Sequence, residues 1–80
     1  MYHVYILRSL KYQNQTYVGY TLDVQERLKN HNSGGSIHTA SGKPWELIMF
    51  LSFHDDQKAR EFEYYLKTQS GRAFLSKRFL

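Results

Sequence analysis

Cysteine is absent from this 80-residue chain, and its apolar residues never form a long run. Without cysteine, neither disulfide bonds nor a zinc site with thiolate ligands can form. No basic segment followed by an apolar one opens the chain, and no apolar stretch approaches the roughly eighteen residues of a membrane-spanning helix. We therefore expect a soluble cytoplasmic protein without a membrane partner. The length allows one domain, residues 1–80, and is too short for two.

Several catalytic motifs are also absent. The chain has no thiol nucleophile, no G-x-S-x-G nucleophile elbow and no glycine-rich phosphate loop of the P-loop kind. Composition alone leaves a Ser/His/Asp triad open. The tyrosines, arginine, histidine and carboxylates that remain suit phosphodiester hydrolysis. In that chemistry a divalent cation polarises the phosphate, an arginine stabilises developing charge, and a phenol or imidazole handles the proton.

Acidic residues are absent from the end of the chain. The net charge of +4 comes from eleven basic and seven acidic residues, and the charges of residues 1–63 cancel. The excess lies in four residues after Glu63, namely Lys67, Arg72, Lys77 and Arg78. A basic end fits a polyanionic partner such as nucleic acid. It also fits a solvated helix end, where the helix dipole favours cations.

Hydrophobic periodicity predicts six elements in the order ββαβαα. Strands are expected at residues 2–7, 16–21 and 45–53. Helices are expected from a cap at Thr21 or Asp23 to about Asn32, from a cap at Asp55 or Asp56 to about Thr68, and after a cap at Ser70. The first two strands most simply pair as a hairpin. We expect an α/β fold of the α+β type, with a three-stranded mixed or antiparallel sheet flanked by helices.

The first predicted helix carries polar residues beside its apolar stripe. At 3.6 residues per turn, Arg27 and His31 are neighbours and lie beside or within the stripe marked by Val24 and Leu28. Partly burying an arginine is costly unless something pairs with it. Either Arg27 extends its charged end to solvent and His31 bonds a carbonyl, or the two residues are donors aimed at a phosphate.

The second predicted helix places acids on both borders of its apolar stripe. Glu63 lies at one border and Glu61 at the other, so periodicity does not choose between them. Glu63 could form a surface ion pair with Lys67, four residues later, or serve as a ligand.

The ordered motifs resemble those of the GIY-YIG nuclease family over nearly the whole chain. His3-Val4-Tyr5 stands in the place of Gly-Ile-Tyr and Tyr17-Val18-Gly19 in that of Tyr-Ile-Gly, with the two tyrosines twelve residues apart. Residues 20–34 resemble the family's first helix, with its arginine and histidine. Residues 63–67 resemble the stretch with its metal-binding glutamate, and residues 70–75 resemble the ending of small stand-alone members.

The resemblance implies a role for each matching residue. Glu63 would be the one protein ligand of Mg²⁺ or Mn²⁺, which keeps several waters in such a site. Tyr5 and Tyr17 would line the catalytic face, one of them acting as or assisting the general base. Arg27 would bind the scissile phosphate, and His31 would orient groups or relay a proton. The implied function is a metal-dependent endonuclease, with DNA rather than RNA as the substrate and with repair or branched-DNA cleavage among the family's roles.

The strand pattern allows a register that would assemble this site. If Tyr5 faces Gly19 across the hairpin, Leu7 faces Tyr17 and the two tyrosines point to the same side. Gly19 would then leave room for the Tyr5 ring. A slip of one residue would place the tyrosines on opposite faces.

Departures from the family pattern leave other functions open. His3 replaces the first motif glycine, either as a further proton-handling group or as a cover for the site, and residues 37–43 hold few basic residues. A non-catalytic nucleic-acid-binding or partner-recruiting module on the same fold is therefore the alternative. No domain that selects a target is present in these residues, so substrate choice must come from a partner protein or be loose.

Overall fold

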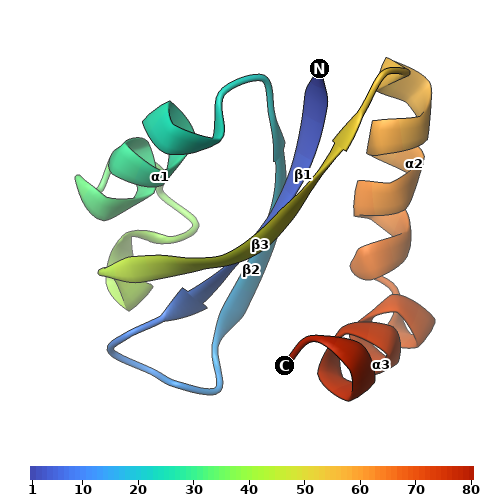
Figure 1. Cartoon of the computed structure of the whole chain (residues 1–80). Helices are drawn as coiled ribbons and strands as arrows, with labels where there is room; N and C mark the ends of the chain where they lie inside the picture. Colours follow the sequence, from blue (N-terminus) through green and yellow to red (C-terminus); the bar gives the residue numbers. More distant parts are fainter.

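The computed structural model describes residues 1–80 and confirms the predicted order of elements (Figure 1). The strands are β1 (Tyr2–Ser9), β2 (Thr16–Thr21) and β3 (Trp45–Phe53). The helices are α1 (Val24–Asn32), α2 (Asp56–Leu66) and α3 (Gln69–Arg78), and a 3₁₀ turn spans Ala40–Gly42. No helix combines the length and the hydropathy needed to cross a membrane.

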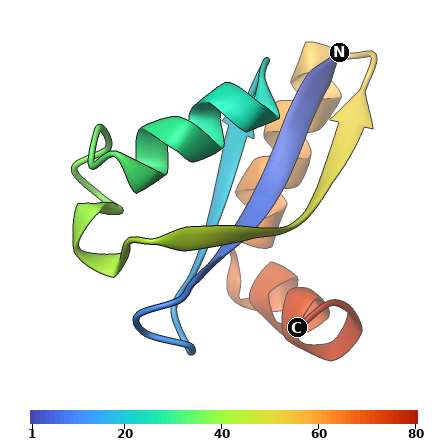
Figure 2. The ribbon, with the colours of Figure 1, turned by 60° about the vertical axis from the view of Figure 1, so that its left-hand side comes forward.

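The sheet has the order β2-β1-β3, with β1 antiparallel to both neighbours. The mixed sheet that the sequence allowed is therefore not formed. The two outer strands are parallel to each other and do not touch, because β1 lies between them. The segment with α1 and the loop after it carries the chain from one edge of the sheet to the other. This crossover places α1 over one face of the sheet, while α2 and α3 lie on the opposite side (Figures 1 and 2).

The central strand is buried on both faces, as its large apolar residues predicted. Val4 to Leu7 are each 2% exposed or less. Alternate residues enter different clusters, because successive side chains of a strand point to opposite faces. Val4 and Ile6 pack under α2 and α3 with Ala59, Leu66 and Leu75.

The other face of β1 supplies a smaller cluster. Tyr5 and Leu7 pack there with Trp45, the first residue of β3. This second cluster lies on the side of α1, so the Tyr5 ring is held between the sheet and that helix. Packing against its neighbours thus fixes the position of the Tyr5 ring.

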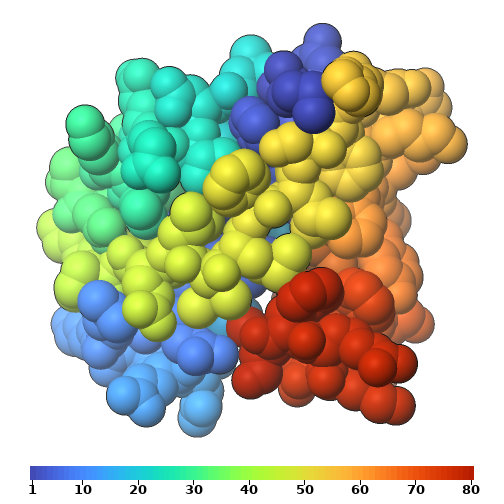
Figure 3. Space-filling view, in the orientation of Figure 1, coloured from blue at the N-terminus to red at the C-terminus, as the bar shows by residue number.

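β3 is an edge strand and stays partly open to solvent. Its apolar residues alternate on both faces, yet Phe50 is 46% exposed and Leu51 is 36% exposed. Figure 3 shows the strand crossing the front of the molecule between the segment of α1 and that of α3. The apolar pattern of this strand therefore predicts its conformation better than its burial.

Carboxylate caps begin the first two helices. The Asp23 side chain accepts from the backbone N–H of Glu26, and that of Asp55 accepts from the N–H groups of Gln57 and Lys58. These bonds satisfy N–H groups that have no partner within the helix. Of the two candidates that the sequence offered for each helix, Asp23 and Asp55 are the caps.

The last helix begins differently from the prediction. Its cap is Thr68 and not Ser70, and α2 ends at Leu66. The Thr68 hydroxyl accepts from the N–H of Gly71 and donates to the carbonyl of Tyr65, so it bridges the two helices. Gly71 makes this joint possible, because a Cβ at that position would lie 1.9 Å from the Tyr65 carbonyl oxygen.

Candidate active site

The two motif tyrosines lie on the same face of the sheet. Tyr5 pairs with Gly19 and Leu7 pairs with Tyr17, which is the register that the sequence suggested. The ring centroids of Tyr5 and Tyr17 are 6.3 Å apart. Tyr5 is only 2% exposed, whereas Tyr17 is half-buried at the edge of the sheet. One phenol is therefore enclosed and the other can meet a substrate.

Gly19 makes room for the enclosed phenol. A Cβ on Gly19 would come within 2.3 Å of the Tyr5 hydroxyl and 2.4 Å of the ring carbon that bears it. Real Cβ atoms do not approach other atoms so closely, so any side chain at this position would push the ring out of place. Gly19 of the second motif is therefore required for the position of Tyr5 in the first.

The Tyr5 hydroxyl is one end of a buried hydrogen-bond chain. It lies 2.7 Å from Nε2 of His31, and Nδ1 of His31 lies 2.6 Å from the Thr39 hydroxyl. Thr39 donates in turn to the carbonyl of Ser36. Because the enclosed Tyr5 hydroxyl has no other acceptor, we assign Tyr5 O–H as donating to Nε2 and His31 Nδ1–H as donating to Thr39.

Burial shifts the pKa values of this pair in opposite directions. It raises the pKa of Tyr5 to about 12, and the neighbouring Arg27 only partly offsets the effect. It lowers the pKa of His31 to about 4, and the charge of Arg27 adds to that decrease. Both groups are therefore neutral at pH 7, in agreement with a phenol that donates and an imidazole that accepts.

Arg27 lies one turn before His31 and is half-buried beside the pair. Its Nη1 donates to the side-chain oxygen of Asn30 over 2.6 Å, and it takes part in neither of the two ion pairs of the molecule. Four of its five N–H donors are thus not committed to this bond. His31 bonds two hydroxyls and not a backbone carbonyl, so the first interpretation of this helix is wrong for His31.

Glu63 lies on α2 at the rim of the same region. Its side chain is 23% exposed and accepts from Nζ of Lys67 over 3.0 Å. That Nζ is also 5.8 Å from the centroid of the Tyr17 ring. Glu61 instead accepts from Gln57 on the exposed side of the helix, so Glu63 is the acid nearer the tyrosines.

No cluster of three His, Cys, Asp or Glu side chains is placed to hold a metal ion. A cation at this face would therefore rely on the single carboxylate of Glu63.

His3 replaces the first glycine of the first motif. It bonds the Ser52 hydroxyl over 2.7 Å and packs edge-on against Phe50. Its ring is thus engaged with β3.

The four basic residues of the chain end divide into two pairs by their position. Lys67 and Arg72 line a groove between β2 and α3, whereas Lys77 and Arg78 are exposed on the last turn of α3 and line no cavity. The sequence gives the charge of these four residues but not where their side chains lie, so it could not distinguish the two pairs.

Thr39 is a residue of the site that the sequence did not reveal. It is 1% exposed, and its carbonyl accepts from the indole N–H of Trp45 over 2.9 Å. The loop has no periodicity that could have revealed this. Asn30, the partner of Arg27, had a recognisable signal, since a polar residue three positions along a helix is a neighbour.

Comparison with known proteins places these features in a family. The family model described as the GIY-YIG catalytic domain matches residues 1–77. The UPF0213 protein YazA of Bacillus subtilis is 44% identical over 55 residues, covering 68% of this chain and 56% of YazA. The structure-specific endonuclease subunit SLX1 of Chaetomium globosum is 40% identical over 72 residues, covering 82% of this chain and 22% of that protein.

A solved structure agrees with the sequence relationship. The solution NMR structure of the UPF0213 protein BH0048 from Bacillus halodurans is similar with a TM-score of 0.58 and 31% identity, covering 99% of this chain and 87% of that one. The chain thus spans about half of YazA and about a fifth of the SLX1 protein, but most of the bacterial domain of known structure. The chain belongs to the GIY-YIG nuclease family.

Proposed function

We propose that this protein is a divalent-metal-dependent endonuclease that hydrolyses phosphodiester bonds in DNA. The observation that carries the proposal is the hydrogen-bond chain from Tyr5 through His31 to Thr39, enclosed beside the open phenol of Tyr17. Groups with shifted pKa values are concentrated at functional sites, and the shifts of Tyr5 and His31 support a catalytic role for this region.

Tyr17 is the phenol that we assign to the substrate. It is half-buried, its hydroxyl makes no hydrogen bond within the protein, and its ring centroid is 5.0 Å from that of His31. A general base must reach the proton that it removes, so accessibility favours Tyr17 over the enclosed Tyr5. Tyr5 then acts as a positioning residue that holds His31 in one tautomer.

Arg27 is the group that we assign to the scissile phosphate. Its guanidinium has donors to spare and is always charged, so it can stabilise the charge that develops on the phosphate oxygens. Asn30 fixes one edge of the guanidinium and thereby limits the orientations that the rest can take.

The donor set at the rim fits Mg²⁺ or Mn²⁺. Glu63 offers a partly exposed carboxylate, and hard cations of this kind take oxygen ligands and retain several waters. A bound cation would supply positive charge that polarises the phosphate and makes water more acidic. Lys67 already pairs with Glu63, so it would compete with the cation or share the carboxylate with it.

The second part of the proposal concerns the substrate and the pathway, which involve a partner protein. The SLX1 relatives are named as subunits of a structure-specific endonuclease. We propose by analogy that a partner protein directs this domain to branched or damaged DNA in a repair process.

The test is a cleavage panel with single-stranded, duplex, flap and branched DNA in Mg²⁺ and in Mn²⁺. Wild type and Glu63→Ala are compared side by side, with Glu61→Ala as the matched control on the same helix. We expect cutting by wild type and by Glu61→Ala, and none by Glu63→Ala. Equal cutting by all three would point to a contaminating nuclease.

An independent readout follows the metal without any turnover. Titration of the labelled protein with Mn²⁺ should broaden NMR signals of residues around Glu63 and Tyr17. Binding of DNA with no cleavage in either metal, over the whole panel, would favour the alternative of a non-catalytic binding or recruiting module.

A further inference from the structure

A groove runs along the edge of the sheet next to the candidate active site. It lies between β2 and the loop before it on one side and the end of α2 and α3 on the other, with a cavity volume of about 590 Å³. Tyr17 belongs to its wall, so the groove opens directly onto the catalytic face. A cavity of about 300–1,000 Å³ suits a small-molecule group such as one nucleotide.

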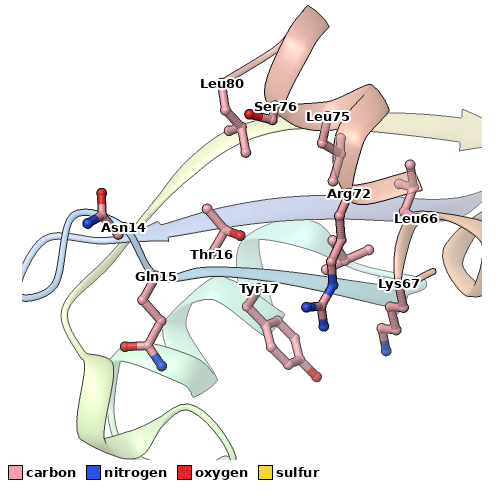
Figure 4. Close-up of a pocket in the computed structure, with 11 residues that line it drawn as sticks. Asn14, Gln15, Thr16, Tyr17, Leu66, Lys67, Arg72, Leu75, Ser76 and Leu80 are labelled. Carbon is pink, nitrogen blue, oxygen red and sulfur yellow. The ribbon is translucent and has the colours of Figure 1, made fainter. Parts of the chain in front are cut away.

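The lining separates into an apolar floor, polar amides and two cations. Leu80, which is 43% exposed, is the open part of the apolar floor, and the buried residues Val18, Leu66 and Leu75 lie behind it. The amides of Asn14 and Gln15 stand at the loop end. Lys67 and Arg72 stand near Tyr17. Figure 4 shows the side chains of Gln15, Tyr17, Lys67 and Arg72 extending to the same side of the sheet, where α1 lies.

Charge distinguishes this groove from the other two cavities of the molecule. It has two cations and no Asp or Glu side chain among its lining residues. The cavity on α2 includes Asp56 and Glu61 with Arg60, and the cavity at the start of α1 includes Asp23 and Glu26 with Arg27. In each of those two cavities the acids outnumber the single arginine. The groove is therefore the one of the three cavities with a positive lining, which suits a phosphate other than the one assigned to Arg27.

The joint between α2 and α3 sets the direction of Arg72. Thr68 caps α3, and Gly71 lets the helix approach the Tyr65 carbonyl where a Cβ could not fit. Arg72 follows immediately and enters the groove wall opposite β2. Its guanidinium forms no ion pair, so its donors are available to a ligand.

Lys67 can serve two partners at once. Its ammonium donates to Glu63 over 3.0 Å, and an ammonium group has three N–H donors. The remaining donors can reach a phosphate that lies between this residue and Arg72. The two cations come from different helices, which fixes the phosphate position more closely than two residues of one helix would.

We propose that this groove is the subsite for the nucleotide that neighbours the cleaved bond. The phosphate of that nucleotide lies on Arg72 and Lys67, and its base lies on the apolar floor with its polar edge toward Asn14 and Gln15. The proposal rests on the proposed nuclease function, since it places the nucleotide relative to Tyr17. A base in the groove has left the duplex stack, so an unpaired nucleotide is the expected occupant.

The first test measures binding of a fluorescein-labelled oligothymidylate to the intact protein in EDTA, where no cleavage occurs. Arg72→Gln is compared with Arg78→Gln, which removes the same charge from the same helix outside the groove. We expect Arg72→Gln to raise Kd about tenfold, as for the loss of a charge-assisted hydrogen bond. It should also lower the salt slope by about 0.7, the value for one phosphate contact on a single strand.

The second test blocks the groove without changing charge. Ser76 lines the groove on α3, so Ser76→Trp should fill it and raise Kd about tenfold, a loss comparable to that of one base stack. Ser70→Trp, on the same helix and outside the lining, is the control and should bind as wild type. Circular dichroism of each variant checks that the fold is intact.

NMR shifts of the wild type on addition of the same oligonucleotide give a readout that needs no variant. Shifts at Asn14, Gln15, Tyr17 and Arg72 would support the subsite. Equal weakening by Arg72→Gln and Arg78→Gln, or shifts confined to the end of α3, would overturn it in favour of diffuse attraction. Because these measurements need no turnover, they stand apart from the cleavage panel: a protein that binds in the groove without cutting would contradict the nuclease proposal alone.

Discussion

The two faces of the sheet are built from the same central strand but use it differently. Under α2 and α3, Val4 and Ile6 join a cluster of apolar residues. Under α1, Tyr5 lies next to the fully buried polar side chains of His31 and Thr39. Every buried polar side-chain atom in the molecule has a hydrogen-bond partner. The α1 face therefore combines a small apolar cluster with a satisfied polar network, whereas the other face is the larger hydrophobic core.

The two faces should therefore contribute differently to folding stability and to catalysis. Apolar burial is the dominant favourable term in folding, while a buried hydrogen bond adds only about 0.5–1.5 kcal/mol net. We infer that the face under α2 and α3 supplies most of the stability and that the face under α1 is free to hold groups with shifted pKa values. Changes on one face should then affect stability, and changes on the other should affect activity.

Tyr17→Phe should give the largest effect and act on activity alone. The phenyl ring keeps the contacts with His31 and Trp45, and the lost hydroxyl has no partner within the protein. Removing a general base lowers the rate by about 10²–10⁴-fold. Single-turnover cleavage measures this loss, and urea unfolding should show an unchanged stability.

Tyr5→Phe is the contrasting variant. It leaves Nε2 of His31 buried without a donor, so the free energy of unfolding should fall by about 1–3 kcal/mol. If this variant lost as much activity as Tyr17→Phe with no loss of stability, Tyr5 would be the general base and Tyr17 would not.

Leu66→Ala should have the largest effect on the opposite face. Leu66 is fully buried, and truncating such a residue costs about 2–5 kcal/mol. Tyr64→Ala is the control on the same helix, because Tyr64 is 74% exposed. Chemical unfolding should separate the two variants clearly, and activity per folded molecule should be unchanged in both. A loss of activity without a loss of stability would show that the two faces are coupled.

The pH dependence of stability should report His31. Its pKa is lowered from 6.5 to about 4 in the folded protein, so between these values the unfolded chain binds a proton that the folded protein does not. Stability from this group is therefore present above pH 6.5 and is lost as the pH falls toward 4. The slope is at most about 1.4 kcal/mol per pH unit.

Urea unfolding at a series of pH values in this window measures the slope. His31→Gln should be less stable at pH 7 and should lack the part of the slope that belongs to the imidazole. The difference between the two profiles removes the contributions of other titrating groups. Parallel profiles would mean that the pKa of His31 is the same in the folded and unfolded states.

The helix caps should give the smallest effects and sharpen the comparison. Asp23→Ala and Asp55→Ala each remove a cap, at a cost of about 0.5–2 kcal/mol. Asp55 accepts two N–H groups and Asp23 one, so the loss of Asp55 should cost more. Only Asp23→Ala should also lower activity, since α1 carries Arg27 and His31. Thermal unfolding and cleavage of the two variants test both statements.

Local signals in the sequence were sufficient for much of the fold. β2 and β3 have the predicted bounds, because both begin and end where apolar alternation does. The hairpin has the register that was suggested because it puts Tyr5 and Tyr17 on one face and leaves room for the Tyr5 ring beside Gly19. The helical period alone placed His31 and Arg27 near the sheet, because their spacing from Val24 is fixed by helix geometry.

Features that depend on distant contacts escaped prediction. Thr39 is buried because Trp45 and His31 bind the loop from two sides, and nothing within the loop sequence indicates either contact. Thr68 displaced Ser70 as the cap because α3 packs against the end of α2. The groove likewise joins β2 to α3, two elements far apart in the chain.

The enclosure of the Tyr5 hydroxyl also makes its proton observable. A phenolic proton normally exchanges with water too quickly to be seen, but this one lies in a 2.7 Å bond to His31 on a residue that is 2% exposed. Its exchange with solvent should be limited by local opening of α1 from the sheet. A downfield hydroxyl resonance would then report, in a single signal, how often the resting site opens.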